Sequence, residues 1–127
     1  MSLQKSPLYA YLPAADVARA RKFYEEKLGF KAGKEIAGGV VYQFGDHTAA
    51  FLYPTPNAGT SQASQAFWQV KDVEQEVAQL RARGVHFENY PGTTDGIMSA
   101  GGAKAAWFRD SEGNILALVQ NAKGSAG

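Results

Sequence analysis

The amino-acid sequence predicts an α+β fold built from two similar modules, each with the element order βαβββ. The main observation is that a strand-like run followed by an amphipathic helix occurs twice along the chain. Each predicted helix starts at an aspartate suited to the N-cap and ends at a glycine suited to a left-handed conformation. These residues are Asp16 and Gly29 in the first module, and Asp72 and Gly84 in the second, at nearly equal separations.

Module one is expected to span about residues 7–54. Its first strand is predicted over residues 8–12, an apolar and aromatic run that ends at Pro13. The helix that follows has charged side chains on most faces and one apolar stripe, formed by Val17, Ala20, Tyr24 and Leu28. Three shorter strands are then predicted, over residues 31–36, 40–44 and 49–53.

Module two is expected to span about residues 65–121, after a linker over residues 55–64 that is rich in proline, glycine and small polar side chains. A strand over residues 65–70 leads into a helix that has Asp72 at its N-cap and buries Val73, Val77 and Leu80. Further strands are predicted over residues 85–90, 104–109 and 115–120, the last two as a closing hairpin.

A glycine-rich stretch over residues 91–103 separates the last predicted helix from the closing hairpin. It contains Gly92, Gly96, Gly101 and Gly102, which is unusual for a loop in so small a domain. Two interpretations are open at this point. The stretch is either a flap over a binding site or an irregular connection with a β-bulge.

Composition limits the classes of function. The 127 residues are most simply one compact domain, with 45% hydrophobic and 20% charged residues. The absence of cysteine excludes disulfides, thiolate metal sites and cysteine nucleophiles. A net charge of +1, spread along the chain, gives no basic surface for nucleic acid or anionic lipid. We therefore expect neither nucleic acid nor membrane as a partner.

We expect neither a signal peptide nor a membrane span from the sequence. Residues 1–7 lack the apolar core of a signal peptide, and no segment has the roughly 20 apolar residues that cross a bilayer. We expect a cytoplasmic protein. Residues 122–127 contain nothing to bury and are expected to fray.

Three segments together indicate a family. They are Leu-Pro-Ala-Ala-Asp-Val at residues 12–17, Phe-Tyr-Glu-Glu-Lys-Leu-Gly-Phe at residues 23–30, and a strand-turn-strand signature at residues 107–118. This combination resembles the vicinal oxygen chelate superfamily, which includes glyoxalase I, bleomycin-resistance proteins and extradiol dioxygenases. The resemblance covers residues 8–120. It implies that the strands form a half-open, cup-shaped mixed sheet with the helices outside, and that the chain is a homodimer.

Metal-dependent members of that superfamily hold a divalent ion with histidine and glutamate side chains that point into the cup. Carried over to this chain, the four ligand positions fall on Tyr9, near Phe51, on Gln65 and on Ala117. These side chains cannot replace imidazole nitrogen and carboxylate oxygen as ligands. We therefore expect no metal and no other cofactor, and we assign no catalytic residue.

Aromatic and amide side chains remain as candidates for binding a small molecule. The period of two along a strand places them on shared faces, and the candidates are Tyr9, Tyr11, Phe51, Tyr53, Gln65, Phe67 and Ala117. Such a cup suits a flat apolar or aromatic ligand. For Phe51 and Phe67 a role in the core is somewhat favoured, whereas the polar tips of Tyr9, Tyr11 and Gln65 favour the pocket.

The leading hypothesis is a metal-free protein that binds a small organic molecule in the cup between the modules. One alternative is an enzyme of the same superfamily, either a metal-dependent lyase, isomerase or dioxygenase, or an acid/base catalyst that uses Tyr9 or Tyr11. A second alternative is sequestration of an antibiotic. The net charge of +1 offers no attraction to cationic drugs.

Overall fold

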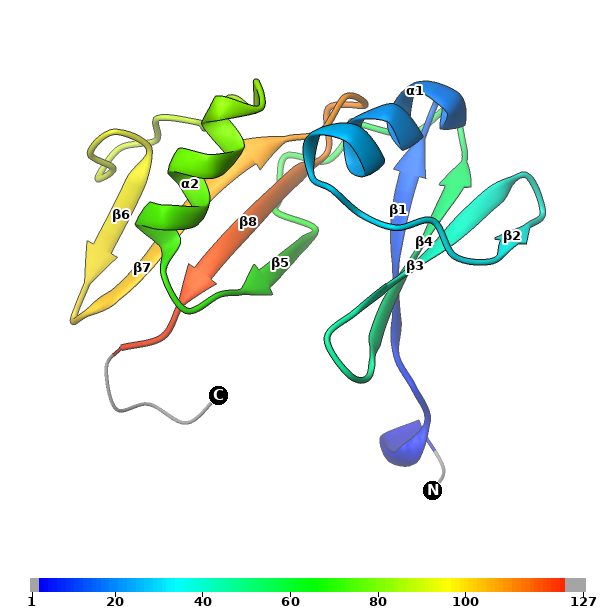
Figure 1. Cartoon of the computed structure of the whole chain (residues 1–127), viewed down its shortest axis with the longest axis horizontal. Helices are drawn as coiled ribbons and strands as arrows, with labels where there is room; N and C mark the ends of the chain where they lie inside the picture. The colour runs from blue at the N-terminus through cyan, green and yellow to red at the C-terminus, as the bar shows by residue number, and fades with distance from the viewer. Residues whose placement is uncertain (1–2, 123–127) are drawn as a thin grey trace.

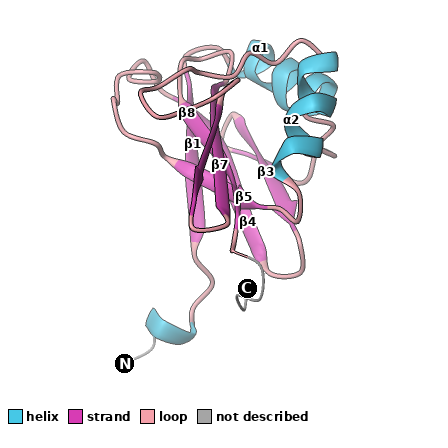
Figure 2. Cartoon of the chain, turned by 90° about the vertical axis from the view of Figure 1, so that its left-hand side faces the viewer, coloured by secondary structure: helices cyan, strands magenta, loops and turns pink. Residues whose placement is uncertain are grey.

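Two four-stranded mixed sheets lie side by side, and the helices cover one side of both (Figure 1, Figure 2). The structure is a computed structural model that describes residues 3–122. Neither sheet closes on itself. The predicted α+β class is therefore confirmed. The predicted frayed tail starts at residue 122, and residues 123–127 lie outside the described part of the chain.

The first sheet, sheet A, is formed by the first half of the chain. A short 3-10 helix, Leu3–Lys5, precedes it. Its strands lie in the order β1-β4-β3-β2, with β1 parallel to β4 and the other pairs antiparallel. Their bounds are Tyr9–Ala14 for β1, Glu35–Ile36 for β2, Gly39–Phe44 for β3 and Thr48–Pro54 for β4.

The second sheet, sheet B, repeats the same arrangement. Its strands lie in the order β5-β8-β7-β6, with β5 parallel to β8 and the other pairs antiparallel. Their bounds are Ala66–Gln69 for β5, Ile97–Ala100 for β6, Ala103–Arg109 for β7 and Ile115–Gln120 for β8. The shared topology of the two sheets confirms the repeat predicted from the sequence.

Both helices begin where the sequence predicts. Helix α1 (Val17–Lys22) and helix α2 (Val73–Ala82) each follow an aspartate whose carboxylate accepts a hydrogen bond from a backbone amide three residues later. Gly29 and Gly84 follow the helical segments with positive φ angles of 79° and 91°. Among residues 3–122, no helix combines the length and apolar character that crossing a bilayer requires.

The first helix changes from α to π geometry over Phe23–Lys27. The amide of Leu28 donates to the carbonyl of Phe23 at 3.1 Å, which is the spacing of a π-helix. Within this segment Tyr24 is fully buried, and Glu25 accepts a hydrogen bond of 2.8 Å from the hydroxyl of Tyr42 on β3. The π segment therefore supplies side chains that fix the helix to the rest of the fold.

Strand β1 runs past Pro13, where the sequence analysis ended it. Pro13 lies opposite Tyr53 in the parallel pairing of β1 with β4. β1 is an edge strand, so one side of it has no neighbouring strand. Proline, which lacks an N–H donor, is tolerated at such a position. The prediction that the strand ends at Pro13 is wrong for this reason.

The strand predicted over residues 85–90 is also wrong. That segment forms only an isolated bridge between Phe87 and Phe108. The edge strand of sheet B is instead β6, within the glycine-rich stretch. Gly101 and Gly102, both with positive φ, make the tight turn into β7. Much of this stretch is therefore a hairpin.

In module one, the strand predicted over residues 31–36 is reduced to the two residues of β2.

Aromatic rings join the two halves of the core on the helix side of the sheets. Trp68 of sheet B lies 5.5 Å from the ring of Phe30 and 5.6 Å from that of Phe44, both from module one. It also stacks on Phe108 of β7 at 6.3 Å. The buried residues of both modules form one continuous cluster, so each module completes the core of the other.

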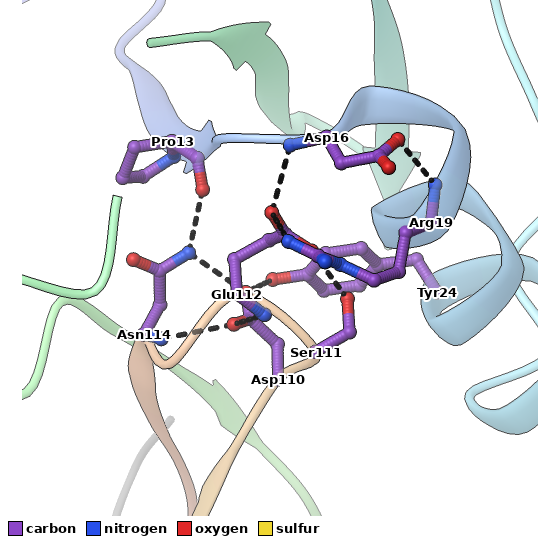
Figure 3. A network of polar contacts seen from close by, with 8 residues as sticks. All are labelled: Pro13, Asp16, Arg19, Tyr24, Asp110, Ser111, Glu112 and Asn114. Carbon is purple, nitrogen blue, oxygen red and sulfur yellow. Dashed lines mark hydrogen bonds and ion pairs between the residues drawn. The ribbon is translucent and has the colours of Figure 1, made fainter. Parts of the chain in front are cut away.

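A buried polar network ties the turn between β7 and β8 to β1 and the first helix (Figure 3). The side-chain amide of Asn114, which is only 1% exposed, donates to the carbonyl of Pro13 at 2.7 Å and to Asp110 at 2.8 Å. The hydroxyl of Tyr24 donates to the same Asp110 carboxylate. Oδ1 of Asn114 accepts from the amide of Gly59 in the linker at 3.1 Å.

Glu112 in the same turn binds the start of helix α1. Its carboxylate accepts from the amide of Asp16 at 2.9 Å and forms an ion pair of 2.8 Å with Arg19. The Glu112 side chain is fully buried, whereas that of Arg19 is 55% exposed. The hydrogen bonds from Arg19, from the Asp16 amide and from Ser111 lower the pKa of Glu112 to about 2, although burial opposes this shift.

We predict that Asn114→Ala lowers the free energy of unfolding by about 2–4 kcal/mol, because it removes the side-chain partner of the Pro13 carbonyl and of the Gly59 amide and one of the donors to Asp110. Urea unfolding followed by circular dichroism measures this loss. The exposed Asn89 supplies the control, and Asn89→Ala should change the free energy by less than about 0.5 kcal/mol. Equal losses in the two variants would show that the network does not stabilise the fold.

A second prediction concerns pH. Because the pKa of Glu112 is lower in the folded chain than its ordinary value of 4.5, the ion pair stabilises the fold fully above about pH 4.5. This stabilisation is lost as the pH falls toward about 2. Glu112→Gln should therefore lower the urea midpoint of unfolding at neutral pH. In this variant the midpoint should also fall less steeply than in wild type as the pH is lowered from about 4.5 to about 2. Glu26→Gln, at an exposed helix position, should keep the wild-type decline. Parallel declines for Glu112→Gln and wild type would contradict the assignment.

Candidate functional site

Four aromatic side chains gather on the face of sheet A opposite the core. Tyr9 and Tyr11 come from β1, and Phe51 and Tyr53 come from the adjacent β4. We call this surface the aromatic face. The alternation along both strands is clear, since Leu12 and Leu52, which are fully buried, point to the core. The face-sharing predicted for these four residues therefore holds in the structure.

Three of the four rings of the aromatic face, those of Tyr11, Phe51 and Tyr53, are in mutual contact. The centroid of Tyr11 lies 4.7 Å from that of Tyr53 and 6.1 Å from that of Phe51. Phe51 and Tyr53 stack with centroids 6.2 Å apart. Tyr9 and Tyr11 are nevertheless 52% and 65% exposed. Large rings that are ordered by one another and still open to solvent present a ready surface for a second flat molecule.

A hollow of about 340 Å³ lies on this face. This volume is at the small end of the range for ligand pockets. Its lining is apolar apart from two phenol groups and carries no charged side chain. The lining residues in the described part of the chain are Tyr9, Ala10, Tyr11, Ile36, Val41 and Phe51.

Ile36 and Val41 also belong to this site, although neither was predicted from the sequence. Val41 pairs directly with Phe51 across β3 and β4, so it occupies the same face. The alternation of β3 was a usable signal for Val41, because the buried Val40 and Tyr42 flank it. Ile36 had no such signal, since β2 has only two residues.

The candidates on sheet B lie apart from this hollow. Phe67 is 60% exposed, so its expected role in the core is wrong. It lines a separate small hollow of about 150 Å³ together with residues that include Phe44 and Trp68. Gln65 is exposed, and Ala117 is buried next to Phe67 in the parallel pairing of β5 with β8. Neither residue lines the hollow on the aromatic face or the small hollow beside Phe67.

The four positions that the resemblance assigns to metal ligands fall on Tyr9, near Phe51, on Gln65 and on Ala117. Two of them have no donor atom in the side chain, one is an amide and one is a phenol. This set does not fit a divalent cation, which prefers imidazole and carboxylate ligands. Residues 3–122 also contain no group of three or more histidine, cysteine, aspartate or glutamate side chains that could hold a metal ion.

Comparison with protein families gives one match. A family model described as Glyoxalase/Bleomycin resistance protein/Dioxygenase superfamily matches residues 7–118. A comparison with curated proteins gives no match.

Three solved structures illustrate the similarity of the fold. UcmS2 has a TM-score of 0.74 at 20% identity, with 90% of this chain and 96% of that chain covered. Lactoylglutathione lyase from Agrobacterium tumefaciens has a TM-score of 0.69 at 17% identity, with 91% and 93% covered. TnmS3, an antibiotic binding protein from Streptomyces sp. CB03234, has a TM-score of 0.67 at 23% identity, with 92% and 96% covered. At these identities the likeness shows the fold.

Proposed function

Since this chain belongs to the Glyoxalase/Bleomycin resistance protein/Dioxygenase superfamily, we propose that it binds a small, flat apolar or aromatic molecule without a metal. The family suspected from the sequence is thereby confirmed. The proposed site is the aromatic face of sheet A. A ligand would stack on its rings and take hydrogen bonds from the hydroxyls of Tyr9 and Tyr11.

One observation supports this proposal most strongly. Tyr11, Phe51 and Tyr53 hold one another in place at the edge of an apolar hollow, yet Tyr11 is 65% exposed. Exposing a large ring to water has a free-energy cost that burial in the core would avoid. Binding a flat molecule would remove this apolar surface from water.

The lining of the hollow also supports binding without a metal. Its residues offer two phenol oxygens and no imidazole or carboxylate. The donor set at the four family positions does not suit a divalent cation.

Antibiotic sequestration is a second candidate, favoured by one comparison. TnmS3, which has the same fold at 23% identity, is described as an antibiotic binding protein. Both candidates use the same site, and they differ in the ligand. An uncharged or weakly charged aromatic antibiotic would suit the aromatic face better than a cationic one, because no acidic residue lines the hollow.

We further propose that the chain forms a homodimer. Ligand sites usually bury 70–90% of a drug-sized ligand, and a hollow on one face of one sheet leaves much of a ligand uncovered. Large aromatic side chains on the open side of the sheets are exposed, namely Tyr9, Tyr11 and Phe67. A second copy placed against this surface would cover them and supply the missing wall of the site.

Ligand binding is testable by a thermal-shift screen of flat aromatic compounds. A compound at 100 times its dissociation constant should add about 2.7 kcal/mol to stability. Tyr11→Ala should abolish the shift, because it removes the ring that contacts both Phe51 and Tyr53. Tyr90→Ala should keep the shift, because the ring of Tyr90 packs on Trp107 of sheet B.

The absence of a metal is tested by elemental analysis and by adding a chelator to the thermal-shift screen. Elemental analysis of the purified protein should give no stoichiometric divalent ion, and a chelator should leave the thermal shifts unchanged. One tightly held ion per chain would overturn metal-free binding. Compounds that shift wild type and Tyr11→Ala equally would place the ligand elsewhere.

The homodimer is tested by light scattering, which should give the mass of two chains. Phe67→Glu should give the mass of one chain, because it places a charge among exposed apolar side chains. Ala18→Glu, on the exposed surface of α1, should leave the dimer intact. A monomeric wild-type chain would rule out the dimer and leave the binding proposal standing.

A further inference from the structure

A second apolar hollow lies on the helix side of the molecule, away from the aromatic face. It holds about 170 Å³ and is lined by both modules. Leu28 and Phe30, just after the π segment, form one wall, and Trp68, Phe108 and Leu118 of sheet B lie at the other side. Its lining is therefore the seam where the two halves of the core meet.

A larger, outer hollow adjoins this inner one. Leu28, Glu76 and Leu80 line both spaces, and the outer space holds about 470 Å³ between the end of the first helix and α2. We call the two adjoining hollows the helix-side channel, in which the outer part is the more polar because Gln79 and Arg83 line it. Such a shape suits a small molecule with an apolar body and one polar group.

Glu76 of α2 is the one charged residue that lines the inner hollow within the described chain. It is half-buried, and its carboxylate has no hydrogen bond or ion pair with another residue of the described segment 3–122. A carboxylate beside an apolar floor gains most from a partner that brings its own positive charge.

The cationic residue that lines the outer hollow forms no ion pair with Glu76 within the described residues. Arg83 lines only the outer hollow, and its guanidinium donates to the carbonyl of Lys27 at 3.4 Å, at the end of the first helix. Glu74, the other acidic residue in the first turn of α2, is paired with Lys104. The free carboxylate of α2 at this seam is therefore Glu76.

We propose that this helix-side channel is a second small-molecule site, which takes an aryl or alkyl ammonium compound. The apolar group would lie against Trp68 and Phe108, and the ammonium would bind Glu76. Because the lining comes from both modules, an occupant would contact both halves of the core at once. This site is separate from the aromatic face, so it can exist whether or not that face binds a ligand.

Fluorescence of Trp68 provides the test. The chain has two tryptophans, and Trp107→Phe leaves Trp68 as the single reporter. Three probes of similar size are titrated: 2-phenylethylammonium, the neutral 2-phenylethanol and the anionic 3-phenylpropionate. The ammonium should bind about tenfold tighter than the alcohol, as expected for one charge-assisted hydrogen bond. The carboxylate should bind most weakly.

Variants separate the roles of charge and position. Glu76→Gln should bring the ammonium to the affinity of the alcohol, while Glu26→Gln, an equal change of charge outside the channel, should keep the preference. Tyr11→Ala should also keep it, because Tyr11 lies on the aromatic face. The apo melting temperature of each variant confirms that it is folded.

The proposal is overturned by equal affinities for the three probes, by a preference for the carboxylate, or by loss of the ammonium preference in Tyr11→Ala. A channel covered by a second copy would give no saturable response to any probe, which also overturns it. If Trp107→Phe does not fold, chemical-shift mapping on the wild-type chain replaces fluorescence. Shifts should then appear at Leu28, Trp68 and Leu80 and not at Tyr11 or Phe51.

Discussion

The hydrogen bond from the side chain of Asn114 to the carbonyl of Pro13 connects the two modules at the point on which the aromatic face depends. Pro13 lies on the same strand as Tyr9 and Tyr11, so this bond helps to hold the strand that carries these rings. The bond is buried and supported by Asp110 and Tyr24. In a low-dielectric interior such a network favours a single arrangement, because each alternative leaves a polar group without a partner.

The two acidic side chains of the turn between β7 and β8, Asp110 and Glu112, hold the fold together through hydrogen bonds and an ion pair. Asp110 accepts from Tyr24 and from two groups of Asn114, and Glu112 binds Arg19 and the start of α1. Burial and the nearby Asp110 raise the pKa of Tyr24 well above its usual range, so this phenol stays a donor. The aromatic face is left with uncharged groups, which suits recognition by shape and stacking.

Local signals predicted the helices, and longer-range signals were needed for the rest. Asp16 and Asp72 cap helices as expected, because capping involves only the next turn. Strand β6 was missed because its pairing depends on the Gly101–Gly102 turn and on β7. For the site, alternation placed Tyr9, Tyr11, Phe51 and Tyr53 on one face, but it could not show that Phe67 lies open to solvent. Exposure depends on how the two sheets are arranged, which strand periodicity does not contain.

The π-helical turn makes the first helix sensitive to insertion and deletion. A π-helix accommodates one residue more per hydrogen-bonded ring than an α-helix does. Deleting a single residue from Phe23–Lys27 would restore α geometry and rotate the side chains on one end of the helix by roughly 100° relative to the other. Tyr24 contacts Asp110 in the turn between β7 and β8, and Glu25 contacts Tyr42 on β3. After such a deletion the two side chains could not both keep these contacts. In this segment the fold depends on the number of residues as well as on their chemical identity.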